Sequence, residues 1–316
     1  IDGSHGQRTN PLFNFIMYSA MIRCFLVSGI VFATLLRIFK NSLDSNHLSL
    51  IFLSTIIGKV LILSNIKRNK FSKINIDLCF KGYSELERNK IYKKNIMSSA
   101  RVIFDTGVAW FWSDSKINKN IPYKINGLKN LKKYQDSGTG ILMFFKHSLH
   151  LELDARILAM NCEVYGVQRN HNSEIFEQLQ KNGRLRSIKG IADRRNTIRF
   201  MKWLMSGKTV LYAPDQDYGT ENSNEINFFN NPASTISAPS KIVKKTKCKT
   251  FFVDTIYKQN ILNMNIEELK LDNSSSISFS KQLNEYIESK IILSPHEYLW
   301  QHRRFKSTLG KDNIYK

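Results

Sequence analysis

The chain has 316 residues, 42% of them hydrophobic, and a formal net charge of +21. This length and composition allow a sizeable core in one large domain or two small ones. The charge favours an anionic partner, such as nucleic acid, acidic lipid headgroups or an acidic carrier protein, although a sequence rich in Lys, Asn and Ile is also typical of A/T-rich coding. The cysteines lie far apart without a C-x-x-C pair, which argues against a disulfide framework or a zinc site and fits a reduced compartment.

The first predicted element is an N-terminal membrane helix. The opening hexapeptide IDGSHG lacks Met and is left out of the fold prediction as a trimmed or engineered start. From Leu12 to Leu36 the chain is apolar apart from Arg23, and a bilayer span needs ~20 such residues. Arg23 would be costly at the centre of a bilayer and has to reach an interface. A buried helix in a globular core is the alternative.

Basic residues after this apolar segment predict its orientation. Arg37, Lys40 and the later stretch NIKRNKFSK all follow it on the C-terminal side. Because positively charged flanks stay in the cytoplasm, we expect a single pass with the bulk of the protein on the cytoplasmic side. Residues 1–45 are therefore predicted to form a tail and anchor helix, and residues 46–316 one domain.

Two more helical segments are predicted before residue 113. The apolar stretch Leu48–Leu63 is interrupted by a Gly-Lys pair, which favours an interfacial or packed helix over a second span. Residues 84–112 are predicted to form a helix that starts with a capping box between Ser84 and Glu87. The aromatic cluster DTGVAWFW at its end is typical of a core and, beside a membrane, of a groove for an acyl chain.

From residue 139 onward, short apolar runs alternate with helical periodicity. We predict strands at GILMFF, EVYGV and TVLYAP, and a hairpin formed by TFFVDTIYK and ILNMNIEEL. Helices are predicted at about 148–160 and at SEIFEQLQKNGR, RRNTIRFMKWLMSGK, APSKIVKKT and SFSKQLNEYIESKII. This alternation predicts an α/β fold with a mostly parallel sheet flanked by helices.

The stretch HSLHLELDAR offers candidate catalytic residues. Sites in open α/β sheets lie beyond the carboxyl ends of strands, and His147 occupies that place after GILMFF. His150 and Asp154 have the i, i+4 spacing of an ordinary helical pair. His147 and Glu152 meet only if the histidine lies in the turn before the helix, where a carboxylate on one ring nitrogen would make it a general base of fixed tautomer. Spacing alone leaves a structural role for this pair open.

Six motifs along nearly the whole chain carry a family resemblance. They are, in order, TGVAWFW, HSLHLELDARI, GVQRN, NGRLRSIKG, YAPDQDYG and YLWQHRRFK. In this order they resemble the lipid A biosynthesis acyltransferases of lipopolysaccharide synthesis, especially the lauroyl type. The resemblance implies a glycerol-phosphate-acyltransferase-like domain at a bacterial inner membrane, with His147 and Glu152 as the catalytic pair. His150 departs from the family pattern, in which this position is often small, and so does Gln216, where relatives often have His.

The resemblance also implies the reaction and its partners. An acyl chain, lauroyl in this type, would pass from acyl carrier protein to a hydroxyl on a 3-hydroxyacyl chain of the octulosonate-bearing lipid A precursor, without a metal or other cofactor. His147 would take the hydroxyl proton, with Glu152 orienting its ring. Asp215 lies at another strand end, where it would support the site. The predicted oxyanion or substrate-binding residues are Arg169, Arg184, Arg186, Lys189 and Asp215, although each basic residue could equally belong to a solvated face.

Two other functions remain open at this point. One is another membrane-bound hydroxyl acyltransferase, such as the glycerol-phosphate type, whose histidine and acid are similarly spaced. The other is a basic protein that binds membranes or nucleic acid without catalysis, although the sequence has no helix-turn-helix, zinc-finger or RNP-type segment. We therefore expect no nucleic-acid partner.

Overall fold

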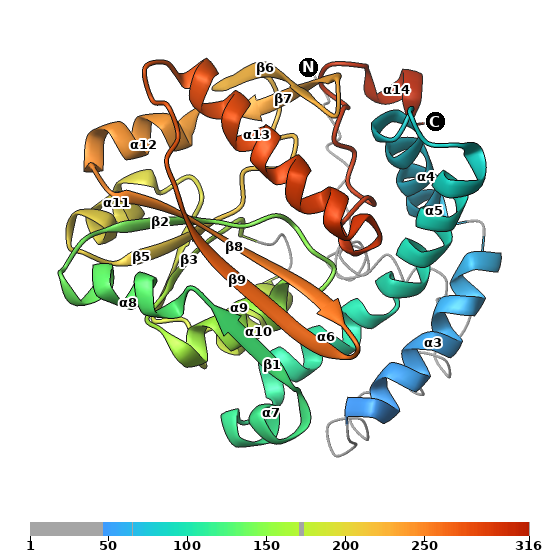
Figure 1. Ribbon diagram of the computed structural model, residues 1–316, viewed down its shortest axis with the longest axis horizontal. Helices are drawn as coiled ribbons and strands as arrows, with labels where there is room; N and C mark the ends of the chain where they lie inside the picture. The colour runs from blue at the N-terminus through green and yellow to red at the C-terminus, as the bar shows by residue number, and fades with distance from the viewer. Residues whose placement is uncertain (1–46, 65, 171–173, 316) are drawn as a thin grey trace, which may run out of the picture.

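A twisted sheet forms the centre of the fold. The computed structural model describes residues 47–64, 66–170 and 174–315. Within these residues a seven-stranded sheet has the order β1-β9-β8-β2-β5-β3-β4 (Figure 1). Five neighbouring strands run parallel, namely β2 (Ile141–Phe144), β3 (Tyr165–Gln168), β4 (Gly190–Asp193), β5 (Thr209–Tyr212) and β8 (Lys249–Lys258). The predicted α/β class with a mostly parallel sheet is confirmed.

The remaining strands run at one edge or outside the main sheet. Strand β9 (Ile261–Leu269) pairs antiparallel with β8, which confirms the predicted hairpin, and β1 (Tyr123–Asn126) pairs parallel with β9. Strands β6 (Ser223–Phe228) and β7 (Asn231–Ile236) form a separate hairpin. The sequence did not reveal β1, β4, β6 or β7, because short or polar strands carry little apolar periodicity.

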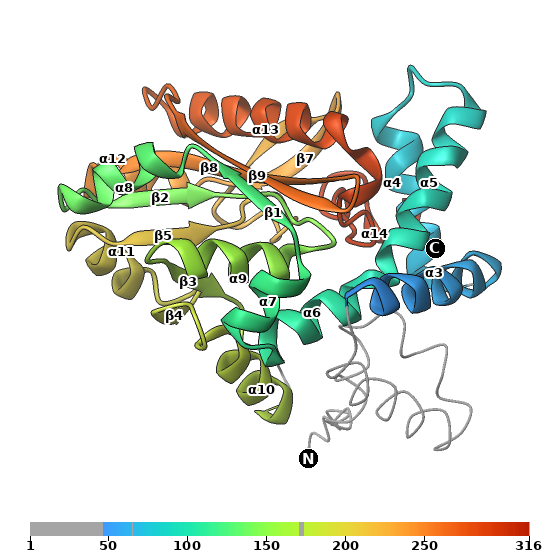
Figure 2. The same cartoon turned by 60° about the horizontal axis from the view of Figure 1, so that its bottom comes forward.

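Helices cover both faces of the sheet (Figure 2). Those that precede it are α3 (His47–Leu63), α4 (Lys67–Cys79), α5 (Glu85–Ser99), α6 (Arg101–Phe111) and α7 (Asp114–Asn120). The others are α8 (Leu128–Asp136), α9 (Leu151–Asn161), α10 (Glu174–Arg184), α11 (Thr197–Met205), α12 (Ala238–Thr246), α13 (Ser276–Leu293), the 3₁₀ turn η2 (Pro295–Glu297) and α14 (Lys311–Ile314). The five helices predicted after residue 139 are all present.

The sequence of β2 shows why the sheet has a core on each face. Successive side chains of a strand point to opposite faces. Leu142 and Phe144 pack in one cluster with α11, α12 and α13, whereas Ile141 and Met143 pack in the other with α6, α8 and α9. All four side chains are fully buried, so this strand is apolar without alternation, as is usual for the centre of a parallel sheet.

The helix predicted over residues 84–112 is two helices. The capping box is confirmed, since the Ser84 hydroxyl accepts from the Glu87 N–H and the Glu87 carboxylate accepts from the Ser84 N–H. The chain then breaks at Ala100, between α5 and α6. Ala100 is fully buried in a cluster with Leu61 and Ile96, whereas Phe104 and Trp110 of α6 pack in the same cluster as Met143 of β2.

No individual helix in the described ranges is both long enough and apolar enough to cross a bilayer. Helix α3 together with α4 meets these criteria by length and composition, but the two segments meet at 84°. The predicted anchor Leu12–Leu36, its Arg23 and the boundary at residue 45 lie outside the described residues. Helix α3 confirms a helix at the second apolar stretch.

Helix α3 approaches α5 closely at Gly58. A Cβ atom at this position would lie 2.9 Å from the Cα of Met97, on the facing helix. We expect Gly58→Val to lower the free energy of unfolding by about 1–3 kcal/mol, because the backbones have to separate. Gly82→Val is the matched control, since nothing lies within 4 Å of a Cβ there. Equal melting temperatures of the two purified variants would contradict the close packing.

Candidate active site

The carboxyl ends of two neighbouring strands bring His147 and Asp215 together. Strands β2 and β5 pair in parallel, with Phe144 opposite Tyr212 at their ends. His147 and Asp215 each follow three residues later. The register of the sheet therefore places the histidine beside the carboxylate, 68 residues away in the sequence.

Asp215 holds both the backbone and the ring of His147. The His147 N–H donates to Oδ2 of Asp215 at 2.7 Å, and Nδ1 of the ring lies 2.5 Å from Oδ1. Burial alone would raise the pKa of Asp215. The charge of His147 and its hydrogen bonds to the carboxylate lower the pKa by more than burial raises it, so the net pKa lies below the ordinary value. The carboxylate is thus ionised and accepts from Nδ1–H, which leaves the Nε2 lone pair of His147 as a base.

The direction of this pKa shift determines how the contribution of Asp215 to folding stability depends on pH. Because the folded pKa of Asp215 is depressed, its contribution to stability is present above the unfolded pKa of about 3.9. That contribution is lost as the pH falls through the lower folded value.

A second chain segment closes the loop that carries His147. Ser148 forms an antiparallel bridge with Tyr298. The N–H of Leu149 donates to the Glu297 carbonyl at 2.8 Å, and the N–H of Leu299 donates to the His147 carbonyl at 2.9 Å. We call residues 145–150, between β2 and α9, the catalytic loop. Four different segments of the chain meet there, namely the ends of β2 and β5, α9 and residues 297–299.

Glu152 lies in the first turn of α9 and has partners of its own. Its Oε2 accepts from Trp110 Nε1 at 2.8 Å and from Arg184 Nε at 3.1 Å, while Oε1 pairs with Arg184 Nη2. Burial raises the pKa of Glu152, but Arg184 and Trp110 bring it below the ordinary value. Glu152 is therefore an ionised partner of Arg184.

This geometry corrects the predicted pairing of His147 with Glu152. The carboxylate on the His147 ring is that of Asp215, and Glu152 turns instead toward α6 and α10. The prediction considered residues close in sequence, whereas the contact depends on which strand neighbours β2. Asp215 lies against His147, as its position at the end of a strand predicted.

His150 is a buried residue with a partner on α6. Its Nδ1 lies 2.7 Å from Oδ2 of Asp105, and its ring packs 4.6 Å from that of Tyr257. Its suggested pairing with Asp154 is electrostatic, without a hydrogen bond: burial raises the pKa of Asp154 and the charge of His150 opposes this, while Oδ2 of Asp154 accepts from Ser148 and Thr255. His150 therefore links α9 to α6.

The predicted basic residues separate into different places. Arg169 follows β3 at the carboxyl edge of the sheet. The Arg184 guanidinium pairs with Glu152 and donates to Gln168, so these two side chains occupy its donors. Arg186 is exposed in the turn after α10. Lys189 precedes β4 and therefore lies at the amino edge, opposite His147, so its predicted role at the site is not supported.

Arg169 belongs to a group of cations that sequence spacing did not reveal. Burial lowers the pKa of Lys306, Asp217 raises it, and the nearby charges of Arg303, Arg169 and Arg194 lower it again. These four cations come from the ends of β3 and β4 and from the C-terminal segment. The carboxyl edge of the sheet thus combines a histidine base with a positively charged surface.

Comparison with known proteins assigns this arrangement to a family. A profile described as bacterial lipid A biosynthesis acyltransferase matches residues 22–307. The chain is 32% identical to the lipid A biosynthesis palmitoleoyltransferase of Escherichia coli (strain K12) over 274 residues, which is 84% of this chain and 88% of that protein. The chain belongs to the bacterial lipid A biosynthesis acyltransferase family.

Other relatives agree with this assignment. The lauroyltransferase of the same organism is 32% identical over 79% of this chain and 83% of its own length. A lipid A biosynthesis acyltransferase of Haemophilus influenzae is 32% identical over 76% of this chain and 78% of its own length. The chain is therefore an acyltransferase enzyme of lipid A biosynthesis, which excludes a non-catalytic nucleic-acid binder.

The C-terminal segment of the acyltransferase is fastened beside the site by Asp217. Its carboxylate accepts from the N–H and hydroxyl of Ser307 at 2.9 and 2.7 Å. The Asp217 N–H donates to Nε2 of His302, and burial lowers the pKa of that histidine well below its ordinary value. His302 is thus a neutral structural acceptor, and the Arg304 guanidinium is likewise buried against β7.

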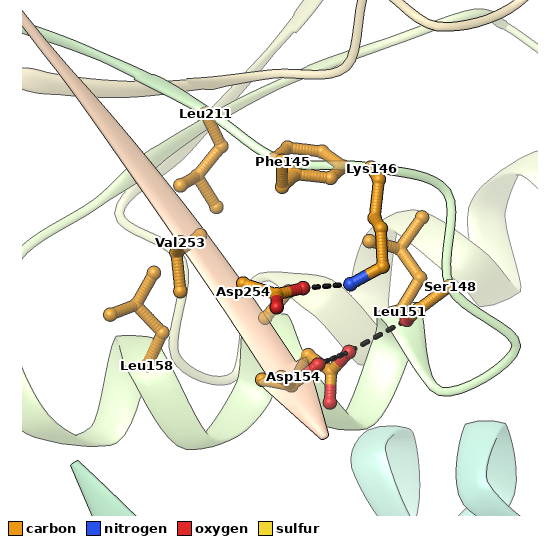
Figure 3. Close-up of a pocket in the computed structure, with 11 residues that line it drawn as sticks. Phe145, Lys146, Ser148, Leu151, Asp154, Leu158, Leu211, Val253 and Asp254 are labelled. Atoms are coloured by element: carbon orange, nitrogen blue, oxygen red, sulfur yellow. Dashed lines mark hydrogen bonds and ion pairs between the residues drawn. The ribbon is translucent and has the colours of Figure 1, made fainter. Parts of the chain in front are cut away.

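A small cavity lies beside the catalytic loop of the acyltransferase (Figure 3). Its volume is about 20 Å³, room for about one water molecule. Leucine and other apolar side chains line much of it, while the polar side consists of Lys146, Ser148, Asp154, Asp254 and Thr255. Lys146 forms an ion pair with Asp254 there.

Asp215→Asn is expected to reduce turnover by about 1,000- to 10,000-fold while the protein stays folded. The amide has nearly the same shape, but it cannot stabilise a histidinium and its NH₂ favours the wrong tautomer of His147. Turnover and thermal melting of the purified variant measure both properties. Asp136→Asn, at the exposed end of α8, is the matched control and should change turnover by less than about threefold. Turnover of Asp215→Asn within tenfold of wild type would refute the role of this carboxylate.

His150→Ala is expected to act on stability. The change leaves a cavity and removes a partner of the buried Asp105, so we expect a loss of about 2–4 kcal/mol in the free energy of unfolding. Turnover measured well below the melting temperature should stay within about tenfold of wild type. His150→Gln should lose less stability, because its amide can still donate to Asp105. A fully folded but inactive His150→Ala would show that His150 takes part in the reaction.

Proposed function

We propose that this enzyme transfers a lauroyl chain from acyl carrier protein to a hydroxyl of a 3-hydroxyacyl chain on the octulosonate-bearing lipid A precursor. The observation that carries the proposal is the His147–Asp215 pair at the ends of β2 and β5, in a chain of the lipid A acyltransferase family. Such a pair provides a general base for activating a hydroxyl.

In the proposed reaction His147 moves one proton. Nε2 of His147 takes the proton of the acceptor hydroxyl as its oxygen attacks the thioester carbonyl. The C–O bond forms, the C–S bond of the carrier breaks, and the histidinium returns the proton to the leaving thiolate. Asp215 keeps the ring oriented and stabilises its positive charge during the transfer. Glu152 pairs with Arg184 and so connects the first turn of α9, which follows His147, to the end of α10.

The cation group suggests where the acceptor binds. Phosphates and sugar carboxylates of a lipid A precursor are anionic, and arginine binds such groups through paired N–H donors. Arg169, Arg194, Arg303 and Lys306 lie close enough for the other three to lower the pKa of Lys306, so a bound anion would relieve their mutual repulsion. We assign the acidic groups of the acceptor to this surface.

Membrane association is a further part of the proposal. Helix α3 exposes a row of large apolar side chains on one face, namely Phe52, Ile56, Val60 and Leu63. This face, the apolar segment Leu12–Leu36 and the net charge of +21 fit a single-pass protein of the bacterial inner membrane with its catalytic domain in the cytoplasm. Release of the full chain from inner-membrane vesicles by salt alone would contradict this location.

The donor and acceptor can be tested together. The purified full chain in detergent is supplied with acyl carrier protein loaded with lauroyl, myristoyl, palmitoleoyl or palmitoyl chains. Acceptors are the tetraacylated precursor with its octulosonate sugars, the same precursor without them, and glycerol 3-phosphate. We expect lauroyl transfer to the sugar-bearing precursor to be favoured by at least about tenfold over the other chains.

Each alternative has its own outcome in this assay. The E. coli lauroyltransferase and palmitoleoyltransferase are both 32% identical to this chain, so overall identity does not choose the donor. Preferential palmitoleoyl transfer would refute the lauroyl assignment, and acylation of glycerol 3-phosphate would refute the acceptor. His147→Ala is the control for background acylation.

A further inference from the structure

The buried ion pair between Lys146 and Asp254 has no role in the reaction described above. Both side chains are almost fully buried, at 2% and 3% exposure. The pair lies on the polar side of the cavity beside the catalytic loop, where the Lys146 amine reaches across to β8 (Figure 3). Replacing such a pair by apolar residues is often neutral or stabilising, so its presence in a core is poorly explained by stability alone.

The sheet register explains why the two residues meet. Strand β2 pairs in parallel with β8 on the side away from β5, with Phe144 opposite Phe252. Lys146 and Asp254 each follow two residues later. One residue further along the loop, His147 is held to the end of β5 by Asp215. Successive residues of the loop are therefore tied to both strands that neighbour β2.

We propose that Lys146 is a positioning residue, which fixes the catalytic loop to β8 through Asp254 so that His147 keeps its geometry. The proposal rests on the proposed function of His147 as the base. Without this tie, the loop keeps its contact with β5 but can shift along it. A displacement of about 1 Å at a catalytic group can reduce the rate about 100-fold.

The electrostatic surroundings keep the ion pair charged at neutral pH. The net pKa of Lys146 is lowered to about 8: burial and the charge of Lys290 lower it, while the charges of Asp154, Glu297 and Asp215 raise it. Asp154 comes from α9, Glu297 from η2 and Lys290 from α13, so these charges come from three different elements. At pH 7 most Lys146 side chains are protonated and remain attracted to Asp254.

Two variants separate positioning from stability. Lys146→Met keeps the length of the side chain but leaves Asp254 buried without its cation, so we expect a lower melting temperature and about a 100-fold lower kcat. Lys146→Met/Asp254→Leu removes both charges and should recover the melting temperature while its kcat stays low. KM for the donor should change less than about threefold in both. Leu131→Ala, at the buried residue of α8, is a control that loses stability and keeps its kcat.

A spectroscopic measurement tests the inference independently of turnover. In histidine-labelled protein the Nδ1 proton of His147, hydrogen-bonded to Asp215, should give a resolved downfield NMR signal. We expect this signal to weaken or move in both Lys146 variants and to persist in Leu131→Ala. If wild type proves inactive with the proposed substrates, the proposed function fails, and this signal still tests the position of the ring.

The opposite results would overturn the inference. A double variant that regains kcat together with its melting temperature would show that the pair serves stability alone. Wild-type kcat and an unchanged His147 signal in folded Lys146→Met would show that the loop does not need the tie.

Discussion

Two hydrogen bonds join His147 to Asp215, and the carboxylate that accepts them is fully buried. A buried carboxylate costs several kcal/mol unless nearby donors compensate its charge. Here the compensation comes from the catalytic residue itself, since both its backbone N–H and its ring contribute. The histidine therefore cannot turn away without leaving Asp215 exposed to that penalty. The same interaction therefore orients the base and stabilises this edge of the sheet.

Other charges near the loop are compensated separately. Glu152 is matched by Arg184 and Trp110, and Asp254 is matched by Lys146. Each pair connects a different element to the carboxyl edge of the sheet. Glu152 and Asp254 share no partner, so a substitution in one of these two pairs leaves the partners of the other in place, and their effects can be measured one at a time.

The two strands that carry the site can be recognised in the sequence because they are short, mostly apolar runs, ILMF and TVLY, followed by polar residues. The sequence prediction therefore placed His147 and Asp215 at strand ends correctly. It paired His147 with Glu152 because nothing local shows that β5 lies beside β2, which is a property of the whole sheet. Lys189 was misplaced for a related reason. With only four residues, β4 was not recognised as a strand, so its amino end was not identified.

The ion pair of Lys146 had a signal that was overlooked. Lys146 directly follows the apolar run ILMFF and precedes His147. At the end of a buried strand its charge needs a partner, unless the chain turns out toward solvent. Its partner could not be found in the same way, because Asp254 sits within a long buried strand whose neighbours become known only from the fold. The local sequence shows that Lys146 needs a partner, and the order of the strands shows that this partner is Asp254.

The bridge between Ser148 and Tyr298, together with the hydrogen bonds of Asp217 to Ser307, has a consequence during translation. A ribosome adds roughly 5–20 residues per second, so on the order of 10 seconds separate the synthesis of His147 from that of Ser307. During this interval the nascent chain carries the histidine without the segment that closes its loop. The catalytic base therefore acquires its final geometry only after residues 297–307 have been synthesised.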